Sequence, residues 1–264
     1  MIGFKEGEES MNENLLHMGI DIGSTTVKVV VLDYQENLLF SDYQRHFADI
    51  LKTLHQILEQ AKSVMENHSL TVTITGSGGM ALAKHINVSF VQEVVAATKV
   101  TKRYYPEVDV AIELGGEDAK ITYFKDGLEQ RMNGTCAGGT GAFIDQMALC
   151  LGVEVTDLDD LAKNSSHIYP IASRCGVFSK TDIQNLIARN ATKEDIAASI
   201  FRAVAVQTAS ALSHGCEIRS KVLFCGGPLT FISSLRKAIA NYFELDLEKD
   251  FVILENANTI PAYG

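Results

Sequence analysis

The sequence predicts an α/β fold made of two related lobes, each with a mixed β-sheet flanked by helices. Three observations predict it. Strand and helix patterns alternate in both halves of the chain. One motif occurs twice, at residues 19–28 and 111–120, with a constant offset of 92 residues (113 − 21, 115 − 23 and 120 − 28). The chain has 264 residues, of which 46% are hydrophobic and 21% charged, so it can bury a substantial core.

Each copy of the motif is an apolar strand that ends in an acid, a glycine turn, and a second strand that carries a lysine. The acid, glycine and lysine are Asp21, Gly23 and Lys28 in the first copy and Glu113, Gly115 and Lys120 in the second. Glycine lets backbone N–H groups approach an anion, and successive N–H groups form an anion-binding nest. We therefore expect the two turns to grip one polyphosphate from opposite sides. The alternative is two ordinary hairpins, which leaves the shared register unexplained.

The acids at the strand ends, Asp21 and Glu113, are candidates to hold the metal ion of that polyphosphate. Mg²⁺ keeps several of its waters and binds few carboxylates, so we expect contact through water. Lys28 is a candidate to neutralise phosphate charge.

The first lobe is predicted to span residues 17–106, after a flexible, polar lead-in at residues 1–16. Alternating apolar residues predict a hairpin, and apolar residues at a spacing of three to four predict helices. The expected elements are a hairpin at 18–33, a helix at 46–66, a strand at 71–74 closed by a glycine-rich turn at 75–79, and a helix at 91–103. The last helix ends before Pro106, because the residue before a proline disfavours helical geometry.

The second lobe is predicted to span residues 107–264. The expected elements are a hairpin at 108–124, helices at 137–151, 180–189, 194–215 and 229–242, and strands at 221–225 and 251–254. Thr192 has the spacing of an N-cap for the third of these helices.

Charge and composition exclude several classes of partner. A net charge of −10 argues against binding a nucleic-acid duplex, which requires neutralisation of its phosphates. No apolar run reaches the roughly 20 residues of a membrane span. The N-terminal residues contain no apolar signal core, which predicts a cytoplasmic protein. Five cysteines, an odd number, argue against a framework of disulfides.

Two cysteines stand where a thiolate or an anion would be stabilised. Cys136 lies in the glycine-rich segment 133–141, which opens a predicted helix, and Cys175 also precedes a helix. A helix N-terminus favours phosphate and lowers the pKa of a thiol. The same segment supplies three candidate ATP contacts, which are Gly138, Gly139 and Thr140. The other three cysteines, Cys150, Cys216 and Cys225, are interpreted as core or packing residues.

Two loop cysteines do not complete a zinc site or a cubane iron–sulfur cluster, each of which takes four ligands. Two thiols per chain would suffice for a cubane cluster if it lay on the two-fold axis of a dimer.

The repeated turns resemble the nucleotide-binding core of the sugar kinase, Hsp70 and actin superfamily. The resemblance implies two ribonuclease-H-like lobes in an actin-like ATPase fold, with ATP in the cleft between them. It places the final small-residue-rich helix of that fold after residues 261–264, so the helix is predicted to be missing. The implied ATP contacts are Gly23, Ser24, Thr25, Thr26, Lys28, Gly115 and Gly116, with Gly226, Gly227 and Pro228 bordering the adenosine.

Four segments together, residues 21–28, 113–120, 133–141 and 173–178, resemble the ATP-dependent activators of 2-hydroxyacyl-CoA dehydratases. That family includes the ATPase subunits of benzoyl-CoA reductase. The resemblance implies a homodimer with one 4Fe–4S cluster between the subunits. Each subunit would hold the cluster with two cysteines, which match Cys136 and Cys175. It also implies ATP-driven transfer of single electrons at low potential to an iron–sulfur dehydratase or reductase, with a ferredoxin or flavodoxin as donor.

Two departures from the family pattern lie in the second turn. Many members have Asp where this chain has Glu113, and Gln where it has Glu117. We predict that Glu117 positions the attacking water, and that Asp21 and Glu113 act with it through the hydrated Mg²⁺, because phosphoryl-transfer sites mainly orient and neutralise. Two alternatives remain open. A sugar or N-acetylhexosamine kinase explains the turns but not the cysteines, and a nucleotide-binding regulator requires no electron transfer.

Overall fold

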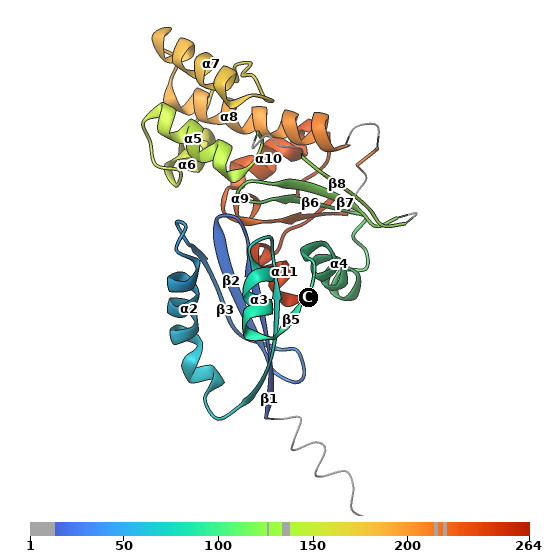
Figure 1. The fold of residues 1–264 in the computed structure, drawn as a ribbon. Helices are drawn as coiled ribbons and strands as arrows, with labels where there is room; N and C mark the ends of the chain where they lie inside the picture. The colour runs from blue at the N-terminus through green and yellow to red at the C-terminus, as the bar shows by residue number, and fades with distance from the viewer. Residues whose placement is uncertain (1–13, 126, 134–137, 214–215, 219–220) are drawn as a thin grey trace, which may run out of the picture. The chain divides into compact units, whose positions relative to one another are not determined.

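The computed structural model describes residues 14–264 except 126, 134–137, 214–215 and 219–220. The chain forms two compact units (Figure 1). The first unit is Met1–Pro106 with Thr259–Gly264, and the second unit is Glu107–Asn258. Each contains a five-stranded mixed sheet flanked by helices, which confirms the predicted α/β class.

The first unit is built on a sheet of strand order β3-β2-β1-β4-β5. Its strands are β1 (Leu15–Ile22), β2 (Thr26–Leu32), β3 (Leu38–Arg45), β4 (Ser69–Thr75) and β5 (Ser89–Phe90). Strand β2 pairs antiparallel with both β1 and β3. In contrast, β4 runs parallel to β1, and β5 runs parallel to β4. Because β1 begins at Leu15, the predicted start of the lobe at residue 17 lies two residues inside the strand.

The second unit repeats this topology with the strand order β8-β7-β6-β9-β10. Its strands are β6 (Val110–Leu114), β7 (Ala119–Tyr123), β8 (Glu129–Met132), β9 (Val222–Cys225) and β10 (Phe251–Val252). Here too the first three strands are antiparallel, and β9 and β10 add in parallel. The duplication that the motif revealed therefore extends over the whole sheet.

Strand β2 is buried on both faces, because elements pack against both sides of its sheet. Val27, Val29 and Val31 pack into the core formed with α2 (Ile50–Met65) and α3 (Gly79–Ile86). Val30 and Leu32 point to the other face and pack against Ala262. A strand buried on both faces needs apolar residues at successive positions, as this one has.

Residues at the end of the chain correct the predicted lobe boundary. Ile260–Tyr263 form a short helix, α11, that packs on β1 and on α4 (Glu93–Tyr104) within the first unit (Figure 1). The contact is so close that a Cβ at Gly19 would lie 1.7 Å from the Ala262 carbonyl oxygen. The last six residues thus belong to the first unit, and the predicted second-lobe range of 107–264 is wrong there.

The second unit carries its helices around one large core. The helices are α5 (Gly141–Leu151), α6 (Asp157–Lys163), α7 (Gly176–Ala188), α8 (Lys193–Thr208), α9 (Gly227–Phe231) and α10 (Ser233–Tyr242). Val110, Ile112 and Leu114, on one face of β6, are buried in the core that these helices share. In the part of the chain that the structure describes, every helix is too short or too polar to cross a bilayer.

Local sequence patterns predicted some helix ends correctly and missed others. Thr192 caps α8 as predicted, accepting a hydrogen bond from the Asp195 N–H at 3.2 Å. The predicted helix at 229–242 is instead two helices, because the backbone of Ile232 is extended and separates α9 from α10.

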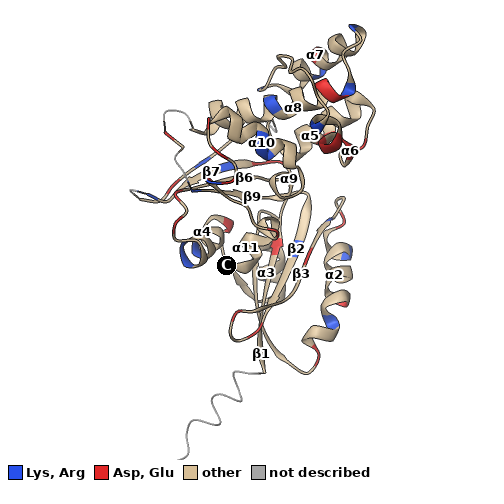
Figure 2. Ribbon diagram, turned by 180° about the vertical axis from the view of Figure 1, so that it is seen from behind, with Lys and Arg blue, Asp and Glu red and all other residues tan. Residues whose placement is uncertain are grey.

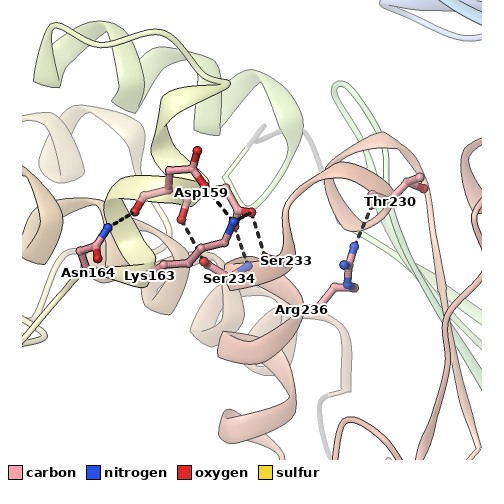
Figure 3. A network of polar contacts seen from close by, with 8 residues as sticks. Asp159, Lys163, Asn164, Thr230, Ser233, Ser234 and Arg236 are labelled. Atoms are coloured by element: carbon pink, nitrogen blue, oxygen red, sulfur yellow. Dashed lines mark hydrogen bonds and ion pairs between the residues drawn. The ribbon is translucent and has the colours of Figure 1, made fainter.

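Asp159 of α6 secures the first turn of α10 (Figure 3). Its carboxylate accepts hydrogen bonds from the Ser234 N–H at 2.7 Å and the Ser233 hydroxyl at 2.8 Å, and pairs with Lys163 at 3.1 Å. Acidic residues of α6 and basic residues of α10 are visible on these neighbouring helices (Figure 2). Burial acts to raise the pKa of Asp159, but the Ser234, Ser233 and Lys163 contacts outweigh it and lower the pKa to about 2.

We expect Asp159→Asn to lower the free energy of unfolding by about 1–2 kcal/mol at pH 7, after allowance for solvent screening. A carboxyl with a lowered folded-state pKa stabilises the fold above its unfolded pKa and stops doing so as the pH falls through its folded pKa. The difference from wild type should therefore shrink between pH 3.8 and about 2. Urea unfolding across that range measures it. Asp160→Asn is the control, because Asp160 pairs with the same lysine but its side chain is 82% exposed.

Candidate functional site

The two hairpin turns that the sequence singled out have the same backbone geometry. In the first unit the Gly23 N–H donates to the Thr26 carbonyl at 2.9 Å, and in the second the Gly115 N–H donates to the Asp118 carbonyl at 2.8 Å. Both pairs are related by the offset of 92. Asp118 was not among the predicted site residues. The offset of 92 residues makes it the counterpart of Thr26, which was among them.

Each turn is flanked by a cross-strand pair of an acid and a lysine. Asp21 lies opposite Lys28 in the register of β1 and β2, and Glu113 lies opposite Lys120 in that of β6 and β7. Lys28 contacts the fully buried Asp21 carboxylate at 2.6 Å. Burial acts to lower the pKa of Lys28, but attraction to Asp21 and their hydrogen bond outweigh it, so the pKa lies above its ordinary value. Lys28 is therefore a cation at neutral pH.

The second pair is looser and has an additional acid. Lys120 lies 3.5 Å from the Glu113 carboxylate and 2.8 Å from the Asp118 carboxylate. Glu117, at the tip of the same turn, is exposed. Each lysine thus contacts the carboxylate that was predicted to hold the metal ion. The sequence had instead predicted that Lys28 contacts phosphate.

A glycine with positive φ follows the fourth strand of each sheet, β4 or β9, and lies against the strand that leads into the turn. Gly76 has φ +89°, and a Cβ there would lie 2.3 Å from the Ile22 carbonyl oxygen. Gly226 has φ +84°, and its Cβ would lie 2.1 Å from the Leu114 carbonyl oxygen. Only glycine fits such an approach. Gly227 is buried and Pro228 half-buried where α9 begins.

Serine hydroxyls lie beside the first turn. The Ser24 hydroxyl is 3.4 Å from that of Ser77, which belongs to the glycine-rich loop after β4. The sequence marked this loop as a turn but not as part of the site. Its place next to the first turn follows from the parallel pairing of β4 with β1, which joins residues far apart in the chain.

The N-terminus of α5 braces the second turn. The Gly141 N–H donates to the Gly115 carbonyl at 2.9 Å, and the Ala142 N–H donates to the Gly116 carbonyl at 2.7 Å. The second turn therefore accepts the first two N–H groups of α5. Gly138, Gly139 and Thr140, which precede the helix, are buried.

Of the two predicted cluster cysteines, Cys175 lies among the described residues. Cys136 is outside the described residues. Gly138 packs so closely on the segment before Cys175 that its Cβ would lie 2.8 Å from the Arg174 carbonyl oxygen and 3.3 Å from that of Ser173. Cys175 is the half-buried residue at the start of α7. Among the described residues, no three His, Cys, Asp or Glu side chains form a cluster for a metal.

The other cysteines have different surroundings. Cys225 is buried, and burial raises the pKa of its thiol well above the ordinary value, with Glu113 adding to the rise and Lys120 opposing it. Cys150 packs against the core, as predicted. The sulfur of Cys216 lies 3.0 Å from the guanidinium of Arg131.

Residues 18–252 match the BadF/BadG/BcrA/BcrD ATPase family. One relative is the (R)-2-hydroxyglutaryl-CoA dehydratase activating ATPase of Acidaminococcus fermentans, 29% identical over 215 residues, or 80% of this chain and 82% of the relative. The crystal structure of that dehydratase's component A matches with a TM-score of 0.82 and 25% identity, over 94% of this chain and 95% of the other. The activator of the 2-hydroxyisocaproyl-CoA dehydratase from Clostridium difficile, with bound ADPNP, matches with a TM-score of 0.81 and 26% identity, over 94% and 91%.

We expect Lys28→Met to lower the free energy of unfolding by about 3–5 kcal/mol, because it leaves a buried carboxylate without its cation. Denaturant unfolding at neutral pH measures the change. The double variant Asp21→Asn with Lys28→Met is the control, since it removes both charges and should recover a large part of the loss. Equal stabilities for Lys28→Met and wild type would contradict the importance of the pair.

Proposed function

The chain belongs to the BadF/BadG/BcrA/BcrD ATPase family, and from this premise we propose that it is an ATP-hydrolysing, iron–sulfur activator. It drives low-potential single-electron transfer to a 2-hydroxyacyl-CoA dehydratase or a related reductase. Two of its relatives are named as activators of such dehydratases, and a third as a subunit of benzoyl-CoA reductase. One observation carries the proposal. The close packing of Gly138 on Ser173 and Arg174 brings the segments that contain both predicted cluster cysteines together in a unit that also has a phosphate turn.

The two glycine turns bind the phosphates of ATP, and the acids beside them serve its Mg²⁺. Asp21 and Glu113 provide carboxylate oxygens, which are the ligands that Mg²⁺ prefers. Their lysine partners limit the excess negative charge that would otherwise repel the γ-phosphate. Glu117 is exposed at the tip of its turn, which suits a group that orients the attacking water.

Cys136 and Cys175 of two subunits hold the 4Fe–4S cluster. The described part of the chain fits this role because Cys175 stands at the start of a 13-residue helix, where a thiolate is stabilised. A cluster of this type supplies one-electron chemistry when bound.

Helix α5 links the second phosphate turn to the cysteine segments. Its first two N–H groups are bonded to Gly115 and Gly116, and further along it the Gln146 side chain lies against Gly176 (3.0 Å from a Cβ there), at the start of α7. A helix moves as a rigid element, so a shift of the turn on phosphate release carries α5 against the first turn of α7. The protein thereby couples its nucleotide state to the surroundings of Cys175.

An apolar surface next to Cys175 supports the homodimer. Val177 and Phe178 of α7 are 70% and 65% exposed, and Leu149 on the adjoining α5 is 78% exposed. Large apolar side chains exposed together mark contact surfaces. A second copy that covers them brings two Cys175 residues toward the dimer axis.

The electron donor is a ferredoxin or flavodoxin.

We expect protein purified without oxygen to contain about two irons and two sulfides per chain in a dimer. Cys175→Ser should lose the iron, because serine does not replace a thiolate ligand, while Cys150→Ser should keep it. Iron and sulfide assays with native mass spectrometry give the measurement. A protein without iron that still binds ATP would favour the regulator alternative, and ATP-dependent phosphorylation of a sugar would favour the kinase alternative.

We expect Glu117→Ala to lower kcat for ATP hydrolysis by about 100-fold or more without a matching change in KM, since a group that orients the attacking water acts in the transition state. Steady-state ATPase assays measure both constants. Glu107→Ala, an exposed glutamate of the same unit, is the matched control. Unchanged turnover in Glu117→Ala would remove the role assigned to Glu117.

A further inference from the structure

Equivalent carbonyls of the two turns are held by different groups. In the second unit the Gly115 carbonyl accepts the N–H of Gly141 at the start of α5. Its counterpart in the first unit, the Gly23 carbonyl, lies 3.2 Å from Nε2 of His46. The main-chain N–H of His46 also donates to the Thr25 carbonyl of the same turn at 3.1 Å. A single buried residue therefore braces the first turn at two points.

The hydrogen bonds of His46 define which ring nitrogen carries the proton. The Ala48 N–H donates to Nδ1 at 3.1 Å, so Nδ1 is an acceptor. Nε2 is then the protonated nitrogen and donates to the Gly23 carbonyl. Both ring nitrogens are used, and the residue is only 6% exposed. The imidazole thus acts as a fixed strut between the loop after β3 and the turn.

The loop that carries His46 adopts a conformation that its sequence disfavours. The Asp49 N–H donates to the His46 carbonyl at 2.7 Å, which closes a four-residue turn. The two central residues, Phe47 and Ala48, have φ values of 45° and 68°. A turn with positive φ at both central positions prefers Asn-Gly, because Cβ atoms are strained there. Strained backbone persists only where its surroundings impose it, and it gathers at functional sites.

We propose that His46 is a positioning residue for nucleotide binding, which holds the Gly23–Thr26 turn in its phosphate-binding conformation. The inference rests on the proposed function. His46 touches no phosphate itself and acts through the Gly23 and Thr25 carbonyls. Because it braces the turn equally in the ground state and the transition state, its loss weakens ATP binding more than it slows hydrolysis.

The test compares His46→Leu with His46→Gln by titration with Mg·ADPNP. Leucine fills the space without hydrogen bonds, so Kd should rise about five- to tenfold, as expected for the loss of buried hydrogen bonds. Glutamine offers a donor and an acceptor at similar positions and should stay within about twofold of wild type. In ATPase assays the KM of His46→Leu should rise while kcat stays close to wild type. An unchanged Kd for His46→Leu would overturn the inference.

A second set of variants separates nucleotide binding from loop stability. Phe47→Asn with Ala48→Gly supplies the residues that the turn prefers, so it should raise the unfolding temperature and leave Kd unchanged. Adding His46→Leu to this pair keeps the loop shape without the strut, and Kd should still rise. A triple variant that binds as tightly as wild type would show that His46 has only a structural role. If wild type itself does not bind Mg·ADPNP, the proposed function fails, whereas equal binding by wild type and His46→Leu defeats this inference alone.

Discussion

A carboxylate at the end of the first strand of each sheet, paired with a lysine directly across the hairpin, is the constraint around which both units are organised. Asp21 has no exposure to solvent, and a buried charge is tolerated only with a close partner. Lys28 provides that partner at 2.6 Å. The pair fixes the register of β1 and β2, so the glycine turn between them is held at one place on the edge of the sheet.

The loop after the fourth strand of each sheet, β4 or β9, reinforces the same geometry. Gly76 and Gly226 both have positive φ and lie against the carbonyls of Ile22 and Leu114, which are related by the offset of 92. A side chain at either position would push the loop after the fourth strand away from the turn. The two units thus reach one arrangement with few identical residues, because the backbone contacts are the part that the duplication preserves.

The two turns differ in what braces them, and this difference divides their roles. The second turn is bonded to α5, which packs on α7, the helix that begins after Cys175. The first turn is bonded to His46 in a local loop that leads into α2. In our proposal the second unit therefore transmits the nucleotide state, whereas the first unit supplies a fixed half of the phosphate site.

The sequence by itself determined the duplication and the α/β class, because these follow from residues close together in the chain. The fixed offset relates the acid and the lysine of one hairpin to those of the other, whereas the pairing of Asp21 with Lys28 and of Glu113 with Lys120 came from the structure. The N-cap of α8 at Thr192 is a local signal of the same kind.

Only the tertiary structure decided which groups surround the turns. His46 is 23 residues from Gly23, and no periodicity marks a histidine whose two ring nitrogens bond to backbone. The sequence predicted Gly138 and Gly139 as ATP contacts but did not show that packing buries them, or that the first two N–H groups of α5 donate to the second turn. The last six residues join the first unit because Gly19 leaves room for Ala262 on β1. Such contacts join residues far apart in the chain, and their energies depend on packing that no local pattern records.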